Sequence, residues 1–215
     1  MKKLHSYLFA TILIGLLSQY LNAQDSPTKV KELYLSGNPL TLDHIGLQYK
    51  SELINGNFFR IGLTNINSAV SKNNYGQSTT PTIPSTATHF SGTFDIGLEK
   101  RKQITNKLTG FYGLNFVIST SLDRNMRQDP TLPRDLRHLT NLSINPGFGF
   151  NSGFIYKISD AFSISAEVIP QLLFKYSSNQ RISGTTKVND TIQGGSFNID
   201  NQSVLVSLVY KWDKK

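Results

Sequence analysis

The segment Phe90-Ser-Gly-Thr-Phe-Asp-Ile-Gly-Leu-Glu99 carries an apolar side chain at nearly every second position, with small, polar or charged residues between them. Val204-Leu-Val-Ser-Leu-Val-Tyr-Lys-Trp212 repeats this period of two, with Val206, Leu208 and Tyr210 on one side. Side chains of an extended strand alternate between its two faces. Each segment therefore predicts a β-strand with one apolar face and one polar face.

Six further segments show related alternation. The expected strands span residues 30–35, 40–53, 59–64, 89–102, 111–119, 142–156, 162–174 and 204–212. Asn55-Gly56 is a strong hairpin signal, because both residues tolerate positive φ. Pro146 and Pro170 fall inside two of these strands, where each removes a backbone donor. We expect a bulge or a strand end at both prolines.

Three long polar stretches without apolar periodicity are interpreted as exposed loops: Ser71–Ala87, Asp123–His138 and Ser177–Ser196. After the first connection, short turns and these loops alternate along the chain. That rhythm is typical of outer-membrane barrels, with short turns on the periplasmic side and long loops outside. The predicted fold is all-β, an eight-stranded antiparallel up-and-down transmembrane β-barrel.

The N-terminal segment has the features of an export signal. Lys2 and Lys3 precede an apolar run from Tyr7 to Leu17, and Ala23 is a small residue suited to cleavage. We therefore expect a signal peptide at residues 1–23 and a barrel domain at residues 24–215. No apolar stretch after Leu17 approaches the length of a membrane helix.

Composition excludes several classes of protein. The chain has no cysteine, which excludes disulfides and lipidation through an N-terminal cysteine. The signal peptide holds two of the 22 basic residues and none of the 14 acidic ones, so the mature chain has a net charge of +6. No long basic run accompanies this charge, and we expect no nucleic-acid partner.

The direction of the apolar face separates a membrane barrel from a soluble periplasmic ligand-binding barrel, which shows the same period with its apolar face inside. Long strands, aromatic residues at the short-turn ends and a glycine-rich polar face favour the membrane barrel. The aromatic residues are Tyr49, Phe58, Phe59, Tyr112, Tyr156, Phe162, Tyr210 and Trp212. The glycines, expected where side chains of opposite walls meet, are Gly46, Gly62, Gly97, Gly113, Gly147, Gly149 and Gly153.

Four motifs resemble the small eight-stranded outer-membrane β-barrel proteins of Gram-negative bacteria. They are Asp95-Ile-Gly-Leu-Glu-Lys-Arg101, Leu108–Tyr112, Ser163-Ile-Ser-Ala-Glu167 and Leu208-Val-Tyr-Lys-Trp212. The resemblance covers nearly the whole mature chain and concerns architecture rather than activity. It implies that the barrel-assembly machinery reads the C-terminal strand ending at Trp212. This chain departs from the family by continuing with Asp213-Lys214-Lys215.

Charged residues on the polar face are expected inside the barrel. They are Lys50, Glu52, Arg60, Asp95, Glu99, Arg101, Lys157, Glu167, Lys175 and Lys211. An eight-stranded barrel has little room for an open pore, and buried charges must be paired. We interpret these residues as a plug of ion pairs. A polar channel or proton path is the alternative.

His89-Phe90-Ser91 is similar to the His-x-Ser pair of some outer-membrane acyl hydrolases, in which the histidine accepts the serine proton. A lipid or lipopolysaccharide acyl hydrolase is therefore an alternative function. The pair falls on the polar face, however, and a solvated pair explains it. No phosphate loop, metal cluster or other catalytic motif is present. His44 and His138 stand alone, and we predict no catalytic, cofactor-binding or metal-binding residue.

The predicted function is non-enzymatic: a monomer in the cell outer membrane with a structural or surface-contact role through the three loops. Lipid and lipopolysaccharide are the expected partners. One loop carries four arginines suited to phosphate, Arg124, Arg127, Arg134 and Arg137.

Overall fold

The computed structural model describes residues 30–37, 45–53, 56–75, 83–128, 137–183, 186–198 and 204–213. Within these residues the chain forms ten β-strands in antiparallel pairs. They are β1 (Val30–Gly37), β2 (Ile45–Glu52), β3 (Asn57–Tyr75), β4 (Ile83–Gln103), β5 (Leu108–Arg127), β6 (His138–Lys157), β7 (Phe162–Val168), β8 (Gln171–Ser183), β9 (Thr186–Asn198) and β10 (Val204–Asp213). No helix in these ranges is long and apolar enough to cross a membrane. The expected signal peptide, residues 1–23, lies outside them.

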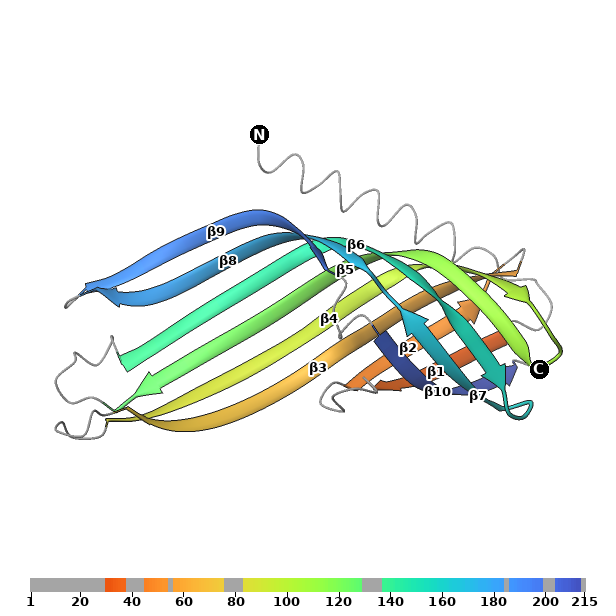
Figure 1. The fold of residues 1–215 in the computed structure, drawn as a ribbon, viewed down its shortest axis with the longest axis horizontal. Helices are drawn as coiled ribbons and strands as arrows, with labels where there is room; N and C mark the ends of the chain where they lie inside the picture. Colours follow the sequence, from red (N-terminus) through yellow and green to blue (C-terminus); the bar gives the residue numbers. More distant parts are fainter. Residues whose placement is uncertain are drawn as a thin grey trace.

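Eight of the described strands close into a ring at one end of the molecule (Figure 1). β1 pairs with both β2 and β10, and the pairing continues through β3, β4, β5, β6 and β7 back to β10. Following the cross-strand partners once around the ring from Tyr156 of β6 leads back to β6 at Pro146, ten residues away. For eight strands this offset corresponds to a strand tilt of roughly 40°. The predicted eight-stranded antiparallel barrel is confirmed.

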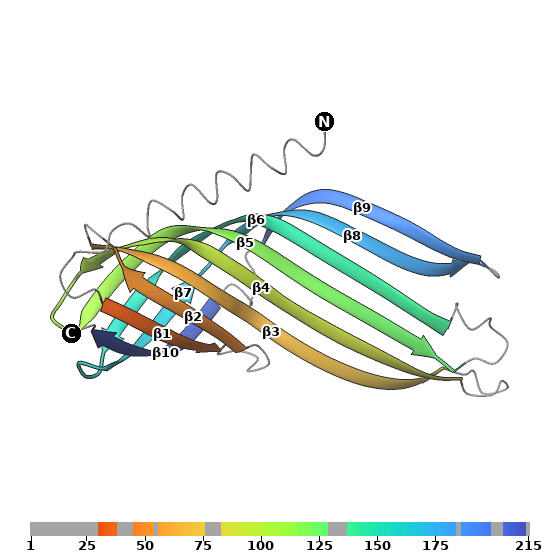
Figure 2. The same cartoon turned by 180° about the vertical axis from the view of Figure 1, so that it is seen from behind.

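A second feature extends from the ring: β3 to β6 run far beyond it and are joined there by β8 and β9 (Figures 1 and 2). We call this part the protruding sheet, in the spatial order β3, β4, β5, β6, β8 and β9. Within the described residues, β9 pairs with β8 alone, and Asn67–Tyr75 of β3 pairs with β4 alone. The protruding sheet therefore has two edges without a paired neighbour in the described part of the chain.

The protruding sheet corrects the three predicted loops. β3 continues to Tyr75 and β4 begins at Ile83, so both ends of Ser71–Ala87 are strands. β5 continues to Arg127 within the predicted loop Asp123–His138. Most of Ser177–Ser196 is the β8–β9 hairpin. These parts escaped the sequence pattern because many of their positions are polar on both faces, which removes the apolar alternation. Within these three stretches, residues 76–82, 129–136 and 184–185 lie outside the described residues.

Pro170 divides one predicted strand into two. β7 and β8 are separated by Ile169 and Pro170, and both pair with the same edge of β6. The expected strand end at Pro170 is therefore confirmed. Pro146 stays inside β6 and pairs in register with Ile118 of β5, whereas no β8 partner is assigned to Asn145 or Pro146. The ladder to β8 is interrupted where proline offers no backbone donor.

The outer face of the wall is apolar, whereas the interior holds more buried polar and charged side chains than apolar ones. On β10, Val206, Leu208 and Tyr210 are 39%, 51% and 46% exposed, whereas Ser207 between them is buried. Aromatic rings cluster near the short-turn end, where the Tyr210 and Trp212 ring centroids lie 5.7 Å apart and those of Tyr49 and Trp212 lie 6.3 Å apart. Phe58 differs from the prediction: it is buried inside the barrel.

At Gly97, Gly113, Gly147 and Gly153 glycine is needed for a reason other than the predicted one, whereas a Cβ on Gly62 or Gly149 would first meet side chains. A Cβ on Gly113 would collide with the carbonyl oxygen of Leu98, and one on Gly153 with that of Ala166. These oxygens belong to the adjacent strand rather than to the opposite wall. The wall therefore bends so sharply at these positions that only glycine fits without a shift of the main chain. At the predicted hairpin, Gly56 has a φ of 72°, while Asn55 lies outside the described residues.

Candidate functional site inside the barrel

Charged side chains from opposite walls meet in the interior. We call Glu32, Lys50, Arg60, Asp95, Glu99, Arg101 and Glu167 the interior charge cluster. Register explains part of this arrangement, because Glu32 is the cross-strand partner of Lys50 and Lys50 that of Arg60. These positions share the inward face of β1, β2 and β3, since cross-strand partners point to the same side.

The centre of the cluster joins β2, β3, β4 and β7. Lys50 Nζ lies 2.6 Å from Glu99 Oε2 and 3.8 Å from Glu167 Oε2. Arg60 Nη1 donates to Glu167 Oε1 across the lumen, and Arg60 Nε donates to Asp95 Oδ1 at 3.2 Å. All five side chains are at most 3% exposed. Each of the five charges thus has at least one oppositely charged partner without solvent, as buried ions require.

Arg101 organises the part of the cluster nearer the short turns. Its Nη1 and Nη2 donate to the two Glu32 oxygens at 2.9 and 2.7 Å, and its Nε donates to Glu99 Oε1 at 2.7 Å. The guanidinium carbon lies 3.5 Å from the centroid of the Phe58 ring, a cation–π contact. Tyr34 Oη donates to Glu32 Oε2 at 2.8 Å. The Arg101 guanidinium is therefore held by Glu32 and Glu99 through its N–H groups and by the Phe58 ring against its planar face.

Side-chain amides extend the cluster towards β5 and β6. With its amide oxygen turned to Arg60, Asn151 accepts from Arg60 Nη1 at 2.9 Å. Its amide nitrogen then donates to Asn115 Oδ1 at 3.2 Å and to the Gly113 carbonyl oxygen at 2.9 Å. Each of these groups links two strands, so the cluster fastens most of the ring from within.

The sequence identified six of the seven charged residues and missed Glu32. Glu32, Tyr34 and Ser36 alternate with the outward Leu33 and Leu35, so the period of two in this short strand was the available signal. Tyr34, Asn115 and Asn151 were also missed, because uncharged polar residues on a polar face look alike in a sequence.

Four predicted interior charges lie outside the interior charge cluster. Three of them still share the inward face at the short-turn end: Lys211 is the cross-strand partner of Glu32, Lys157 lines a hollow together with Glu32, and Glu52 follows Lys50 by two residues in β2. Glu52 is half-buried at the end of β2, Lys175 is exposed on the protruding sheet, and Lys211 is half-buried. Lys157 Nζ lies 2.6 Å from Asp160 Oδ1 in the exposed turn between β6 and β7. The hydrogen bond and the positive charge of Lys157 lower the pKa of the Asp160 carboxyl below its ordinary value.

The interior fits a plug. Val117, Leu205 and Ile169 are also buried, at 1%, 2% and 4% exposure, so apolar side chains share the interior with the charges. Near the short turns Glu32 and Arg101 line a polar hollow of about 260 Å³ that also touches Lys107, Lys157 and Lys211. The described residues contain no group of three acidic, histidine or cysteine side chains able to hold a metal ion.

The predicted His89–Ser91 pair lies on the protruding sheet. His89 Nδ1 is 2.6 Å from Asp123 Oδ1, and their side chains are 41% and 53% exposed. The two residues are cross-strand partners of β4 and β5. The part of the chain that the structure describes shows no hydrogen bond between His89 and Ser91. The acidic partner is therefore present, but the proton-transfer contact to a nucleophile is not.

The remaining candidates are scattered. Arg124 and Arg127 lie three residues apart in β5 and so point to opposite faces. Arg137 directly precedes β6, whose first residue is His138; Arg134 and His44 lie outside the described residues. Among the described arginines, Arg124 and Arg127 therefore do not share one face of β5 as a phosphate site would require.

Comparison with known proteins adds two likenesses. No protein-family model and no curated protein matches the chain. Among solved structures, the chain is similar to Ail, the attachment invasion locus protein of Yersinia pestis, at 11% identity, covering 86% of this chain and 95% of Ail, with a TM-score of 0.28. Ail in complex with the heparin analogue sucrose octasulfate gives 13% identity, 86% and 97% coverage and a TM-score of 0.28. These TM-scores are too low to support an inference about this chain.

Proposed function

We propose that this protein is a non-enzymatic outer-membrane β-barrel. The observation that carries the proposal is the inverted distribution of side chains, with large apolar residues exposed outside and a paired charge cluster inside. A soluble ligand-binding barrel would leave these outer leucines and phenylalanines in water, which is costly over so large an area. In a bilayer the same face contacts acyl chains, and a closed ring satisfies its backbone groups.

The proposal includes the route to the membrane. Residues 1–23 act as a signal peptide in a Gram-negative cell, cleavage follows Ala23, and residues 24–215 form the mature monomer. The barrel-assembly machinery reads the strand that ends at Trp212. The aromatic cluster of Tyr210, Trp212 and Tyr49 then lies at the membrane–water interface, where such rings are favoured.

The proposed role is surface contact through the protruding sheet rather than through flexible loops. Both sheet edges offer backbone donors and acceptors, and an extended segment of a partner adds to such an edge by β-augmentation. The barrel anchors this surface, and its interior charge cluster supplies rigidity rather than conduction.

Gel mobility and fractionation test the membrane barrel. The folded protein should partition with outer membranes and should migrate differently before and after boiling. A protein that stays soluble without detergent and shows no heat shift would refute the proposal.

A shortened hairpin tests the contact role. Replacing Ser177–Ile192 by Asn-Gly removes most of the β8–β9 hairpin but leaves the ring pairs of β7 and β10. Cells displaying the full protein should aggregate or attach to lipopolysaccharide-coated surfaces more than cells displaying the shortened protein. If both proteins keep the heat shift and cells displaying either one attach equally well, the β8–β9 hairpin is not the contact surface.

An acyl hydrolase is the second candidate, favoured by the His89–Asp123 contact alone. Activity of the folded protein on phospholipid or lipopolysaccharide that disappears in Ser91→Ala would support it. No activity in folded wild-type protein would exclude it.

A further inference from the structure

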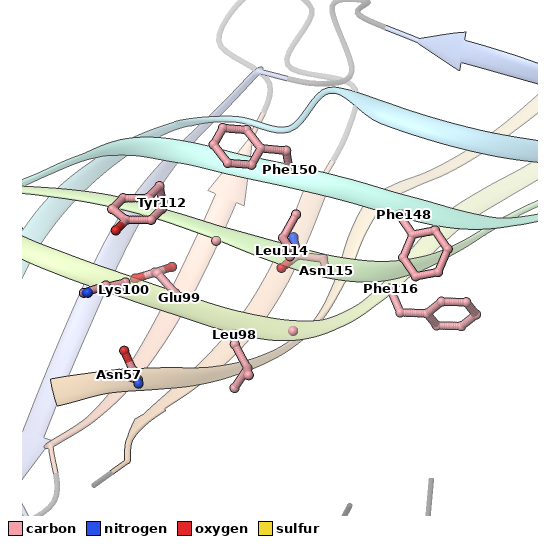
Figure 3. A pocket seen from close by; sticks show the side chains of 12 residues that line it. Asn57, Leu98, Glu99, Lys100, Tyr112, Leu114, Asn115, Phe116, Phe148 and Phe150 are labelled. Atoms are coloured by element: carbon pink, nitrogen blue, oxygen red, sulfur yellow. The ribbon is translucent and has the colours of Figure 1, made fainter. Parts of the chain in front are cut away.

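A groove of about 870 Å³ runs along the outer wall over β4, β5 and β6 (Figure 3). Its sides are outward side chains, among them Leu98, Leu114, Phe148 and Phe150, which are 46%, 68%, 65% and 45% exposed. Its volume is in the range of small-molecule sites. The groove lies on the face that the proposed function places against lipid.

The sharp bend of the wall explains why this groove exists. Gly97 and Gly113 line it, although both belong to the inward-facing positions of their strands. A Cβ on Gly97 would collide with the carbonyl oxygen of Leu114, and one on Gly113 with that of Leu98. On the outside of such a bend neighbouring side chains spread apart and uncover the main chain. The groove is thus formed by the bend of the main chain and does not depend on the rotamer of one side chain.

The residues that line the groove form cross-strand rows, which change from polar at one end to apolar at the other. Asn57, Lys100 and Tyr112 are cross-strand partners and form one row across β3, β4 and β5. The next outward row along the wall is Leu98, Leu114 and Phe150. Phe116 and Phe148 follow, with ring centroids 5.9 Å apart and planes at 72°. The polar row is the one nearer the short turns.

The polar row has one unpaired positive charge. Lys100 is exposed, and the described part of the chain offers it no ion pair, in contrast to Lys157 with Asp160. Tyr112, 49% exposed, lies opposite Lys100 on β5. An ammonium and a phenol at the end of an apolar groove match an anionic headgroup followed by an acyl chain.

We propose that the groove binds one phospholipid of the leaflet at the short-turn side. Lys100 Nζ and Tyr112 Oη donate to its phosphate, and one acyl chain lies along Leu98, Leu114 and Phe148. The binding is non-covalent. The site rests on the proposed membrane barrel, because only a membrane-embedded wall meets this ligand.

Retention of lipid by variants tests the site. Protein refolded into vesicles of phosphatidylethanolamine and phosphatidylglycerol is extracted in mild detergent, and bound phospholipid is counted by native mass spectrometry. Wild-type protein should retain one phospholipid. Lys100→Ala removes the phosphate contact and should lower retention about tenfold, the size of one charge-assisted hydrogen bond. Leu114→Trp fills the groove and should lower retention by excluding the acyl chain.

Matched controls come from the same wall and from another part of the ring. Lys102→Ala removes an exposed lysine two residues further along β4, and Leu47→Trp enlarges a 49% exposed leucine of β2. Both should retain lipid as wild type does. Equal retention in all variants, retention of detergent alone, or retention of added lipopolysaccharide but not phospholipid would overturn the site. If these results accompany a normal heat shift, the membrane barrel stands and only the lipid site fails. Loss of the heat shift in wild type refutes both.

Discussion

Lys50 and Glu99, which lie on β2 and β4 with β3 between them, form a 2.6 Å ion pair in which neither side chain has measurable exposure to solvent. Glu99 also accepts from Arg101 and lies 3.7 Å from Arg60. One carboxylate therefore contacts all three cations of the interior charge cluster. Its neighbours would be left without full compensation if it lost its charge.

Glu99→Gln should accordingly lower the free energy of unfolding by about 3–5 kcal/mol, the usual loss when one partner of a buried pair is removed. Urea titration followed by gel mobility measures it. Asp95→Asn is the matched control. Among the described residues Asp95 forms an ion pair with Arg60 alone and its Oδ2 has no hydrogen-bond partner, so its loss should be smaller. A large rise in planar-bilayer conductance with unaltered stability in Glu99→Gln would show a channel instead of a plug.

Arg101→Lys keeps the charge but removes the fork that binds both Glu32 oxygens and the flat group over Phe58. It should cost about 2 kcal/mol of stability, since hydrogen bonds to charged groups are lost. The reverse exchange at the exposed neighbour, Lys102→Arg, should change nothing. Equal unfolding midpoints for the two variants would contradict the importance of the fork.

Gly113→Ala places a methyl group against the Leu98 carbonyl oxygen and 2.9 Å from Glu99 Cα. Because both are main-chain atoms of the adjacent strand, we expect a loss of about 1–3 kcal/mol or a failure to close the barrel. Gly92→Ala on β4 meets nothing within 4 Å and should be neutral. The heat-shift temperature of both variants distinguishes the sharp bend from a general intolerance of alanine.

Trp212 is the only tryptophan of the chain and so reports depth in the bilayer. Its fluorescence should be quenched more by lipids brominated near the headgroup than by lipids brominated near the chain end, because the aromatic cluster lies at the interface. Stronger quenching by the chain-end bromines would place this cluster in the hydrocarbon core and contradict the proposed orientation.

Asp160 should titrate below its ordinary pKa, and Lys157→Met should raise that pKa towards the ordinary value. A lowered carboxyl pKa adds stability above the ordinary pKa, and this contribution is lost as the pH falls through the folded pKa. Both groups are exposed, so the heat-shift temperature should hardly differ between Lys157→Met and wild type near neutral pH. Carbon-detected NMR of the Asp160 carboxyl measures the shift, and an unchanged pKa in Lys157→Met would contradict the role of the ion pair.

The ring of the barrel was predictable because its outward face is apolar over long segments, as in Phe90–Leu98, and a period of two is then visible. The protruding sheet was not, because segments such as Ser85–His89 are polar or small on both faces. The interior charge cluster was predictable as inward residues, but its pairing was not. Glu167 meets Arg60 across the lumen from a position 107 residues away, and no local pattern encodes that contact. The inward orientation of Phe58 could not be predicted, because Phe58 and Phe59 are adjacent phenylalanines and the sequence does not show which of the two points inward.

The break at Pro170 has a consequence for how the molecule tolerates change. β7 and β10 close the ring by pairing with each other, while β8 pairs with β6 and β9 beyond the break. Insertions or deletions in matched pairs within the β8–β9 hairpin therefore leave the side-chain alternation of the ring unaltered, since only an odd shift exchanges its faces. The barrel can thus keep one anchor while the length of its outer hairpin varies, and this hairpin is the natural position for inserting a foreign epitope.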